Sequence, residues 1–149
     1  MASRERLFTI IVGCGRLGSY LANRMSHDGH HVVVIDIDES AFDRLSAEYS
    51  GFRVEGDATE FAVLTQAKID DADLVIAAAR EDNVNLMVAQ IARKLFHVPR
   101  VMARVYDPQQ AEIYRDFGIE AICPTSIAGD VFLQSLVRSP AANEEGTSQ

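Results

Sequence analysis

Short apolar runs alternate with segments of helical periodicity along this 149-residue chain. A near-continuous apolar run indicates a strand covered on both faces, which is typical of parallel sheets. The run that starts at Leu7 is one example, and it leads directly into a glycine-rich turn. The predicted strands cover residues 7–12, 31–36, 52–55, 73–79, 100–105 and 120–123.

Helices are predicted between these strands from apolar stripes and capping residues. Val84, Val88 and Ile91 recur at helical spacing, and Asp107 followed by Pro108 is a favourable helix start. The predicted helices cover residues 16–27, 38–50, 59–67, 82–96, 107–117 and 127–138. Because strands and helices alternate without a hairpin signal, we expect an α/β fold, a Rossmann-like doubly wound parallel sheet of six strands.

The turn after the first predicted strand has the spacing Gly13-x-Gly15-x-x-Gly18. In dinucleotide-binding folds this spacing gives a tight turn, close approach of the backbone to a pyrophosphate, and close packing of helix on strand. The second predicted strand ends in Asp36, where a carboxylate can accept hydrogen bonds from a ribose. The alternative is a tight strand-to-helix turn in a protein that binds no nucleotide.

Asp36 also bears on which nucleotide the predicted site accepts. A 2′-phosphate beside this carboxylate would meet a like charge, and residues 37–40 contain no Arg or Lys. We therefore expect the site to take NAD(H), ADP or ATP and to reject NADP(H) by roughly a hundredfold. Asp57, in the turn after the third strand, is suited both to capping a helix and to binding a ligand.

Composition excludes several other classes of protein. The formal net charge of -8 and the pI of about 4.9 are unsuited to a nucleic-acid surface. No apolar run is long enough for a transmembrane helix. Cys14 and Cys123 belong to no zinc-binding spacing, and the four histidines are scattered, so we expect no metal site and two small buried thiols. We find no catalytic constellation and expect a binding module rather than an enzyme.

The C-terminal helix is apolar over more than one narrow stripe. Such a helix has to be buried, either on its own sheet or on another chain. We expect the domain to span residues 1–138, and the small, polar and acidic residues 139–149 to form a disordered tail.

These motifs together resemble the nucleotide-binding N-terminal half of RCK (KTN, TrkA N-terminal type) domains. The resemblance covers residues 7–138, and RCK domains regulate potassium channels and Trk/Ktr potassium transporters. The segments that carry it are residues 13–18, 34–38, 56–59, 82–85 and 103–105 and the final helix after Pro124.

The resemblance implies roles for individual residues. The three glycines would cradle the phosphates, Arg16 would bind a phosphate, and Asp36 would hold the ribose hydroxyls. Asp57 and Ala58 would border the adenine, and Arg104 is a further candidate near the phosphates. The full set of implied cofactor-binding residues is Gly13, Cys14, Gly15, Arg16, Leu17, Gly18, Asp36, Ile37, Asp57, Ala58, Ala79 and Arg104.

The resemblance further implies a cytoplasmic regulatory subunit that binds NAD(H), ATP or ADP and gates a membrane-embedded potassium transporter or channel. The final helix matches the family's crossover helix, which implies a homodimer or a higher ring. Full regulatory subunits continue into a C-terminal ligand-sensing subdomain. Thr125 and Ser126 stand where some relatives carry a cation-binding glutamate, so no metal site is carried over. The alternative function is a small NAD-dependent oxidoreductase.

Overall fold

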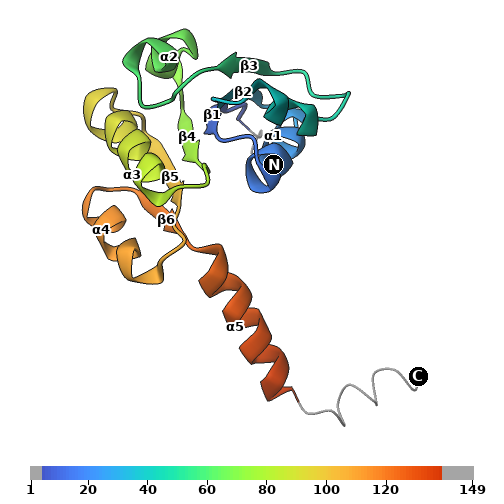
Figure 1. Ribbon diagram of the computed structural model, residues 1–149, viewed down its shortest axis with the longest axis vertical. Coiled ribbons are helices and arrows are strands. Elements are labelled where there is room, and N and C mark those ends of the chain that lie inside the picture. Colours follow the sequence, from blue (N-terminus) through green and yellow to red (C-terminus); the bar gives the residue numbers. More distant parts are fainter. Residues whose placement is uncertain (1–4, 139–149) are drawn as a thin grey trace.

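Six parallel strands form one sheet in the order β3-β2-β1-β4-β5-β6 in the computed structural model, which describes residues 5–138 (Figure 1). The strand order reverses between β1 and β4, so the sheet is doubly wound, as predicted. The strands are β1 (Phe8–Val12), β2 (His31–Asp36), β3 (Phe52–Glu55), β4 (Leu74–Ala77), β5 (Arg100–Arg104) and β6 (Glu120–Ile122).

Helical segments connect successive strands and keep every pair parallel. The α-helices are α1 (Arg16–His27), α2 (Phe61–Gln66), α3 (Asp82–Gln90), α4 (Ala111–Asp116) and α5 (Pro124–Val137). Among the described residues, three segments are 3₁₀ helices, namely η1 (Glu39–Arg44), η2 (Ile69–Asp71) and η4 (Pro108–Gln110). One segment, η3 (Ile91–Leu95), is a π helix.

The helix predicted over residues 38–50 is wrong, because only η1 forms there, as a 3₁₀ helix. Its apolar residues are packed as expected, with Phe42 5% and Leu45 8% exposed. The chain after η1 follows other hydrogen bonds instead of helical ones. The Tyr49 hydroxyl donates to the carbonyls of Val32 (3.1 Å) and Phe52 (2.8 Å). Tertiary contacts therefore override the helical pattern in this segment.

Several other predicted elements differ in their bounds. The strand predicted over 73–79 is shorter, and the helix over 107–117 divides into η4 and α4. The last helix begins at Pro124 rather than residue 127, because proline suits the first helical position, where no N–H is needed. The helix over 82–96 continues from α3 into η3, a π turn in which the Phe96 amide donates to the Ile91 carbonyl at 3.2 Å.

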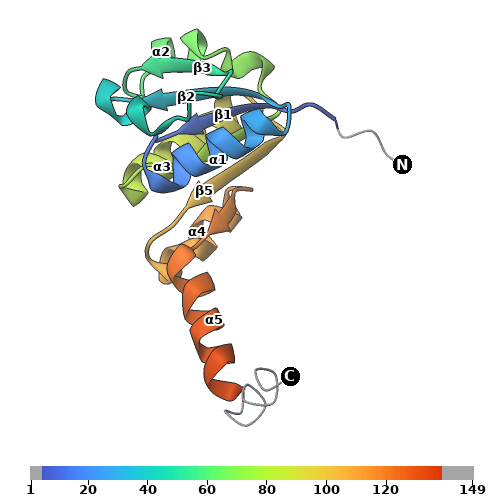
Figure 2. The same cartoon turned by 90° about the vertical axis from the view of Figure 1, so that its right-hand side faces the viewer.

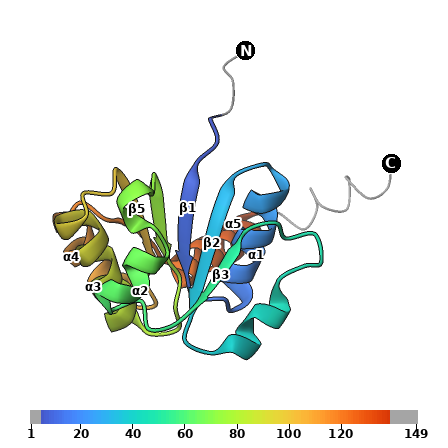
Figure 3. The ribbon, with the colours of Figure 1, turned by 90° about the horizontal axis from the view of Figure 1, so that it is seen from above.

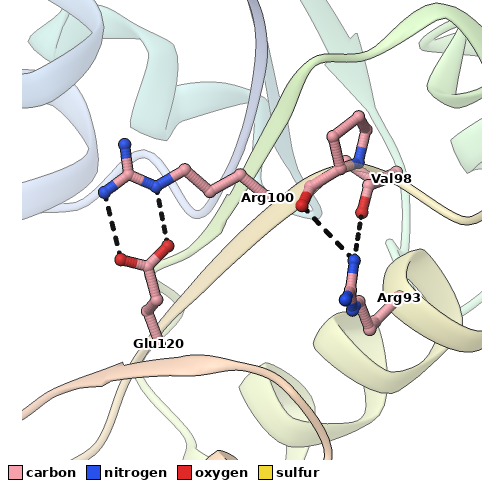
Figure 4. Close-up of polar contacts among 5 residues, drawn as sticks. Arg93, Val98, Arg100 and Glu120 are labelled. Atoms are coloured by element: carbon pink, nitrogen blue, oxygen red, sulfur yellow. Dashed lines mark hydrogen bonds and ion pairs between the residues drawn. The ribbon is translucent and has the colours of Figure 1, made fainter.

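Two arginines fix the entry to β5 after this π turn (Figure 4). The Arg93 guanidinium donates to the carbonyls of Val98 (3.2 Å) and Pro99 (3.3 Å). The Arg100 guanidinium donates to both carboxylate oxygens of Glu120, at 2.7 and 3.0 Å. This pair joins β5 to the edge strand β6, and its hydrogen bonds, helped by the opposite charges, raise the pKa of Arg100 and lower the pKa of Glu120.

Helices cover the two faces of the sheet unequally (Figure 3). One face packs against α2, α3 and α4 in a large core that contains Leu64, Val88 and Tyr114. The other face packs against α1 and the η1 segment in a smaller core. That second core is built on β1 and β2, with residues such as Ile11 and Val34.

The α1 face of the sheet continues from that smaller core, against which Ile76 packs, onto β5 and β6. The register places Ile76 of β4 beside both Ile11 and Met102, and Arg104 beside Ile122. Ile76 and Met102 are half-buried, and Ile122 is 37% exposed. The β4–β6 half of this face therefore carries the apolar Ile76, Met102 and Ile122 together with the charged Arg100, Arg104 and Glu120.

The final helix α5 extends away from the sheet (Figures 1 and 2). None of its residues is buried, so it does not pack on its own sheet, which was one of the two sequence-based expectations. Its exposed large apolar residues are Ile127, Val131, Phe132, Leu133, Leu136 and Val137. The predicted tail at residues 139–149 lies outside the described residues.

Candidate functional site

A cavity of about 550 Å³ lies at the carboxyl ends of the central strands, where the strand order reverses. Open parallel α/β sheets bind ligands at this place. The cavity spans the glycine turn after β1, the end of β2, the turn after β3 and the segment after β4. Its lining residues are Val12, Gly13, Cys14, Gly15, Ile35, Asp36, Ile37, Asp38, Ala41, Arg44, Gly56, Asp57, Ala58, Ala79, Arg80, Glu81 and Val84.

The three glycines of the turn have distinct structural roles. Gly13 has a φ of +100°, and a Cβ there would lie 2.8 Å from the Ala78 carbonyl oxygen. A Cβ on Gly18 would overlap the Gly13 carbonyl, so this glycine allows α1 to pack on the turn. Gly15 has no atom within 4 Å of the place where its Cβ would lie. Its backbone therefore faces free space at the start of α1.

The Asp36 carboxylate is held in place by two backbone amides. The Cys14 amide donates to Oδ2 at 2.7 Å, and the Asp38 amide donates to Oδ1 at 2.9 Å. The first bond ties the end of β2 to the glycine turn across the floor of the cavity. Each carboxylate oxygen retains acceptor capacity for a further donor.

Asp57 closes the turn after β3 and also lines the cavity. Its Oδ1 accepts hydrogen bonds from the Thr59 amide (2.9 Å) and hydroxyl (2.7 Å), which lower the pKa of Asp57. The N-cap residue of α2 is Glu60, so Asp57 does not cap that helix. The turn leaves Gly56, Asp57 and Ala58 along one wall of the cavity.

Cys14 is fully buried within the glycine turn, and burial raises the pKa of its thiol. The charge of Asp36 raises this pKa further. Both Cys14 and Cys123 are free thiols, as expected from the sequence. A buried thiol with a raised pKa is unsuited to nucleophilic chemistry.

Eight of the twelve residues assigned from the sequence line the cavity. Arg16, Leu17, Gly18 and Arg104 do not. Arg16 is the first residue of α1 and its side chain is exposed. Arg104 lies over the ring of Tyr106, with its guanidinium carbon 4.2 Å from the ring centre, and its buried Nε has no hydrogen-bond partner in the described part of the chain.

The set of site residues assigned from the sequence omits two cations of the lining, Arg44 and Arg80. Arg80 directly follows Ala79, and its place after a predicted strand was a usable signal. Arg44 lies outside the residues 37–40 that were searched for a compensating charge. Only the 3₁₀ geometry of η1 brings it back to the cavity.

Residues 5–138 contain no group of His, Cys, Asp and Glu arranged to hold a metal ion. Within the same residues, no helix combines the length and the apolarity that crossing a membrane requires.

Comparison with known proteins shows the family and the fold. The family model of the TrkA-N domain matches residues 9–124. The Trk system potassium uptake protein TrkA of Streptomyces coelicolor is 39% identical over 132 residues, which cover 89% of this chain and 59% of that protein. The chain thus spans about three fifths of the length of that relative.

Solved structures show the same fold. The TrkA-N domain of the inner membrane protein YbaL from Escherichia coli aligns with a TM-score of 0.78 and 19% identity, covering 91% of this chain and all of that one. The RCK domain of GsuK aligns with a TM-score of 0.74 and 24% identity, covering 89% of this chain and 28% of that one.

Two further structures hold GsuK with nucleotides. The GsuK channel bound to NAD aligns with a TM-score of 0.67 and 21% identity over 82% of this chain and 22% of that one. GsuK bound to ADP aligns with a TM-score of 0.69 and 22% identity over 85% and 34%. The relatives are potassium uptake proteins and RCK domains, in agreement with the expectation of a regulatory module rather than an enzyme.

Proposed function

Because the chain belongs to the TrkA-N domain family, we propose that it binds an adenine nucleotide and thereby regulates a membrane-embedded potassium transporter or channel. The observation that carries this proposal is the hydrogen bond between the Cys14 amide and Asp36. It brings a phosphate-suited glycine turn and a ribose-suited carboxylate together in one cavity.

The phosphates would lie at the start of α1. The exposed Gly15 backbone leaves room for them, and the free N–H groups at a helix start attract anions. Arg16 adds an exposed guanidinium at the first position of the same helix. Its side chain has no hydrogen-bond or ion-pair partner among the described residues, so it is available to a phosphate.

The adenosine would extend from Asp36 toward the turn after β3. Asp36 would accept hydrogen bonds from the ribose hydroxyls, and the wall formed by Gly56, Asp57 and Ala58 would border the base. The cavity is of ordinary size for a small ligand. NAD(H), ADP and ATP share the adenosine and the phosphates that this geometry recognises, and GsuK itself is known in NAD-bound and ADP-bound forms.

We also propose that α5 joins two copies of the chain. The helix carries exposed apolar residues such as Val131 and Leu133, and it buries none of them. The β4–β6 strip of the α1 face carries the partly exposed apolar residues Met102 and Ile122, and the charged Arg100, Arg104 and Glu120 lie beside them. The α5 helix of one copy would cover this strip on the other copy. Such a dimer or a higher ring would transmit the nucleotide state to the membrane partner from the cytoplasmic side.

Titration calorimetry tests the binding proposal. The purified protein should bind ADP, ATP and NADH, and Arg16→Ala should weaken ADP and ATP by roughly 10- to 150-fold while leaving adenosine unchanged. Arg24→Ala is a matched control, since Arg24 is an exposed arginine near the far end of α1. Equal losses for adenosine and ADP in Arg16→Ala would contradict the phosphate assignment.

The oxidoreductase alternative is tested with the same protein. NADH absorbance at 340 nm should stay constant in the presence of aldehydes and ketones. Light scattering tests the dimer, because Leu133→Glu should give a folded monomer, whereas Asp130→Ala, on the same helix, should leave the oligomer unchanged. An oligomer that persists in Leu133→Glu would exclude α5 as its interface.

A further inference from the structure

The ribose end of the cavity contains a cation that nothing in the local sequence spacing reveals. Asp36 and Asp38 line this end, and Arg44 lines it with them from the last turn of η1. The charged residues that line the whole cavity are Asp36, Asp38, Asp57 and Glu81 with Arg44 and Arg80. A site with both acids and no cation would repel any additional negative group far more strongly.

The backbone of Arg44 is fixed by contacts on both sides of η1. At its start, the Asp38 carboxylate accepts hydrogen bonds from the Ser40 amide (3.0 Å) and hydroxyl (2.7 Å). At its end, the Arg44 carbonyl accepts a hydrogen bond from the Asn23 side chain at 3.4 Å. Ala41 and Phe42 anchor the turn between them, because both are buried against the sheet.

The guanidinium of Arg44 is available to bind a ligand. Arg44 is exposed, and its side chain forms no hydrogen bond or ion pair with the residues that the structure describes. Its charge nevertheless acts on the cavity, since it adds to the Ser40 hydrogen bonds that lower the pKa of Asp38 and partly opposes the burial that raises the pKa of the Cys14 thiol. Arg44 is therefore close enough to influence a charged group that is bound between the glycine turn and Asp36.

We propose that Arg44 is a specificity-determining residue that partly offsets the repulsion between Asp36 and a phosphate on the adenosine ribose. The inference rests on the proposed nucleotide site and refines it. Asp36 favours free ribose hydroxyls, and Arg44 supplies a guanidinium that a 2′-phosphate can bind. The two residues together give a preference for NADH over NADPH that is smaller than Asp36 alone would impose.

The experiment measures the dissociation constants of NADH and NADPH for the full chain and compares their ratio among variants. Arg44→Ala should raise the NADPH-to-NADH ratio by about tenfold, the effect of losing one charge-assisted contact. Arg44→Lys should keep the ratio close to that of the original protein, because the charge is retained. Arg24→Ala, which removes an equal charge far from the cavity, should leave the ratio unchanged.

Salt provides a second readout that a purely structural role would not change. The difference in the NADPH-to-NADH ratio of dissociation constants between Arg44→Ala and the original protein should shrink as ionic strength rises from about 0.05 to 0.5 M. Salt screens the charge of an exposed side chain such as Arg44. Adenosine 2′,5′-bisphosphate and ADP should reproduce the ratios, since they lack the nicotinamide half.

The outcomes separate the two proposals. If NADH and ADP bind but Arg44→Ala leaves the NADPH-to-NADH ratio unchanged, the role of Arg44 is wrong and the nucleotide site stands. If Arg24→Ala changes the ratio as much as Arg44→Ala, the effect is one of net charge, which also overturns the role of Arg44. If none of these nucleotides binds the original protein, the proposed function fails and this inference fails with it.

Discussion

The side chain of Asn85 and the backbone of Ala79 form a reciprocal pair of hydrogen bonds. The Ala79 amide donates to Oδ1 at 2.8 Å, and Nδ2 donates to the Ala79 carbonyl at 2.9 Å. The same Nδ2 donates to the Arg104 carbonyl at 3.1 Å. Asn85 is completely buried, so one amide of α3 joins the ends of β4 and β5 beside the candidate site.

Replacing Asn85 should therefore destabilise the protein strongly. Asn85→Ala leaves three backbone groups without their partner, and we expect the free energy of unfolding to fall by about 3 kcal/mol. Urea unfolding followed by circular dichroism measures this change. Asn83→Ala, an exposed asparagine on the same helix, is the control and should lie within about 0.5 kcal/mol of the original protein. A similarly small effect of Asn85→Ala would refute the role assigned to this pair.

Substitutions at Gly15 and Gly18 should have different effects, because the first should weaken nucleotide binding and the second should impair folding. A Cβ on Gly18 overlaps the Gly13 carbonyl, so Gly18→Ala should lower the melting temperature or prevent folding. A Cβ on Gly15 meets no protein atom, so Gly15→Ala should fold normally but weaken ADP binding by roughly tenfold or more, because the methyl group occupies the proposed phosphate space. Thermal unfolding and calorimetry on both variants test this. Unchanged ADP affinity in Gly15→Ala would place the phosphates elsewhere.

The ribose role of Asp36 is best tested with altered ligands, because the carboxylate also holds the Cys14 and Asp38 amides. Compared with ADP, 2′-deoxy-ADP and 3′-deoxy-ADP should each bind the original protein more weakly, by roughly 10- to 150-fold per hydrogen bond to a charged group. Asp36→Asn should reduce the penalty for the deoxy ligands. Equal affinities for ADP and both deoxy ligands would show that Asp36 does not contact the ribose.

Cys14 should make stability depend on alkaline pH. Burial raises the pKa of its thiol above the value of 9.0 for an exposed thiol. Folding therefore favours the neutral thiol. The contribution of this preference to the free energy of unfolding is complete below pH 9 and is lost as the pH rises through the pKa of the folded state. Urea unfolding between pH 8 and 11 should show a smaller loss of stability in Cys14→Ala than in Cys123→Ala. Identical pH profiles for the two variants would contradict this assignment.

The strands of the sheet were predictable from the sequence because each strand is a short apolar run that can be recognised without knowing its neighbours in space. Runs such as Val32 to Ile35 are apolar on both faces, and the structure buries all of these residues. The glycine spacing likewise fixed the turn, since Gly13 and Gly18 occupy positions that other residues cannot fill. Eight of the cavity residues followed from the ends of these strands.

What the sequence left undetermined depends on distant contacts. Phe42 and Leu45 have helical spacing, yet the bonds from Tyr49 to Val32 and Phe52 draw the following chain out of a helix. The apolar character of α5 predicted that it would be buried, but a single chain holds no information about which surface covers it.

Because α5 is attached to the rest of the described domain only at its start, at Cys123 and Pro124, a small tilt there moves its far end a long way. Its 14 residues extend about 21 Å from Pro124, so a tilt of about 10° at the junction moves the far end by about 4 Å. Hydrogen bonds connect Cys123, the residue before α5, to the segment that lines the cavity. The Cys123 thiol contacts the Tyr106 carbonyl at 3.8 Å, and the Tyr106 amide donates to Asp82 at 2.9 Å, one residue beyond the cavity-lining Glu81. In the dimer proposed above, a tilt of this size at the junction would displace the α5 residues that contact the other copy.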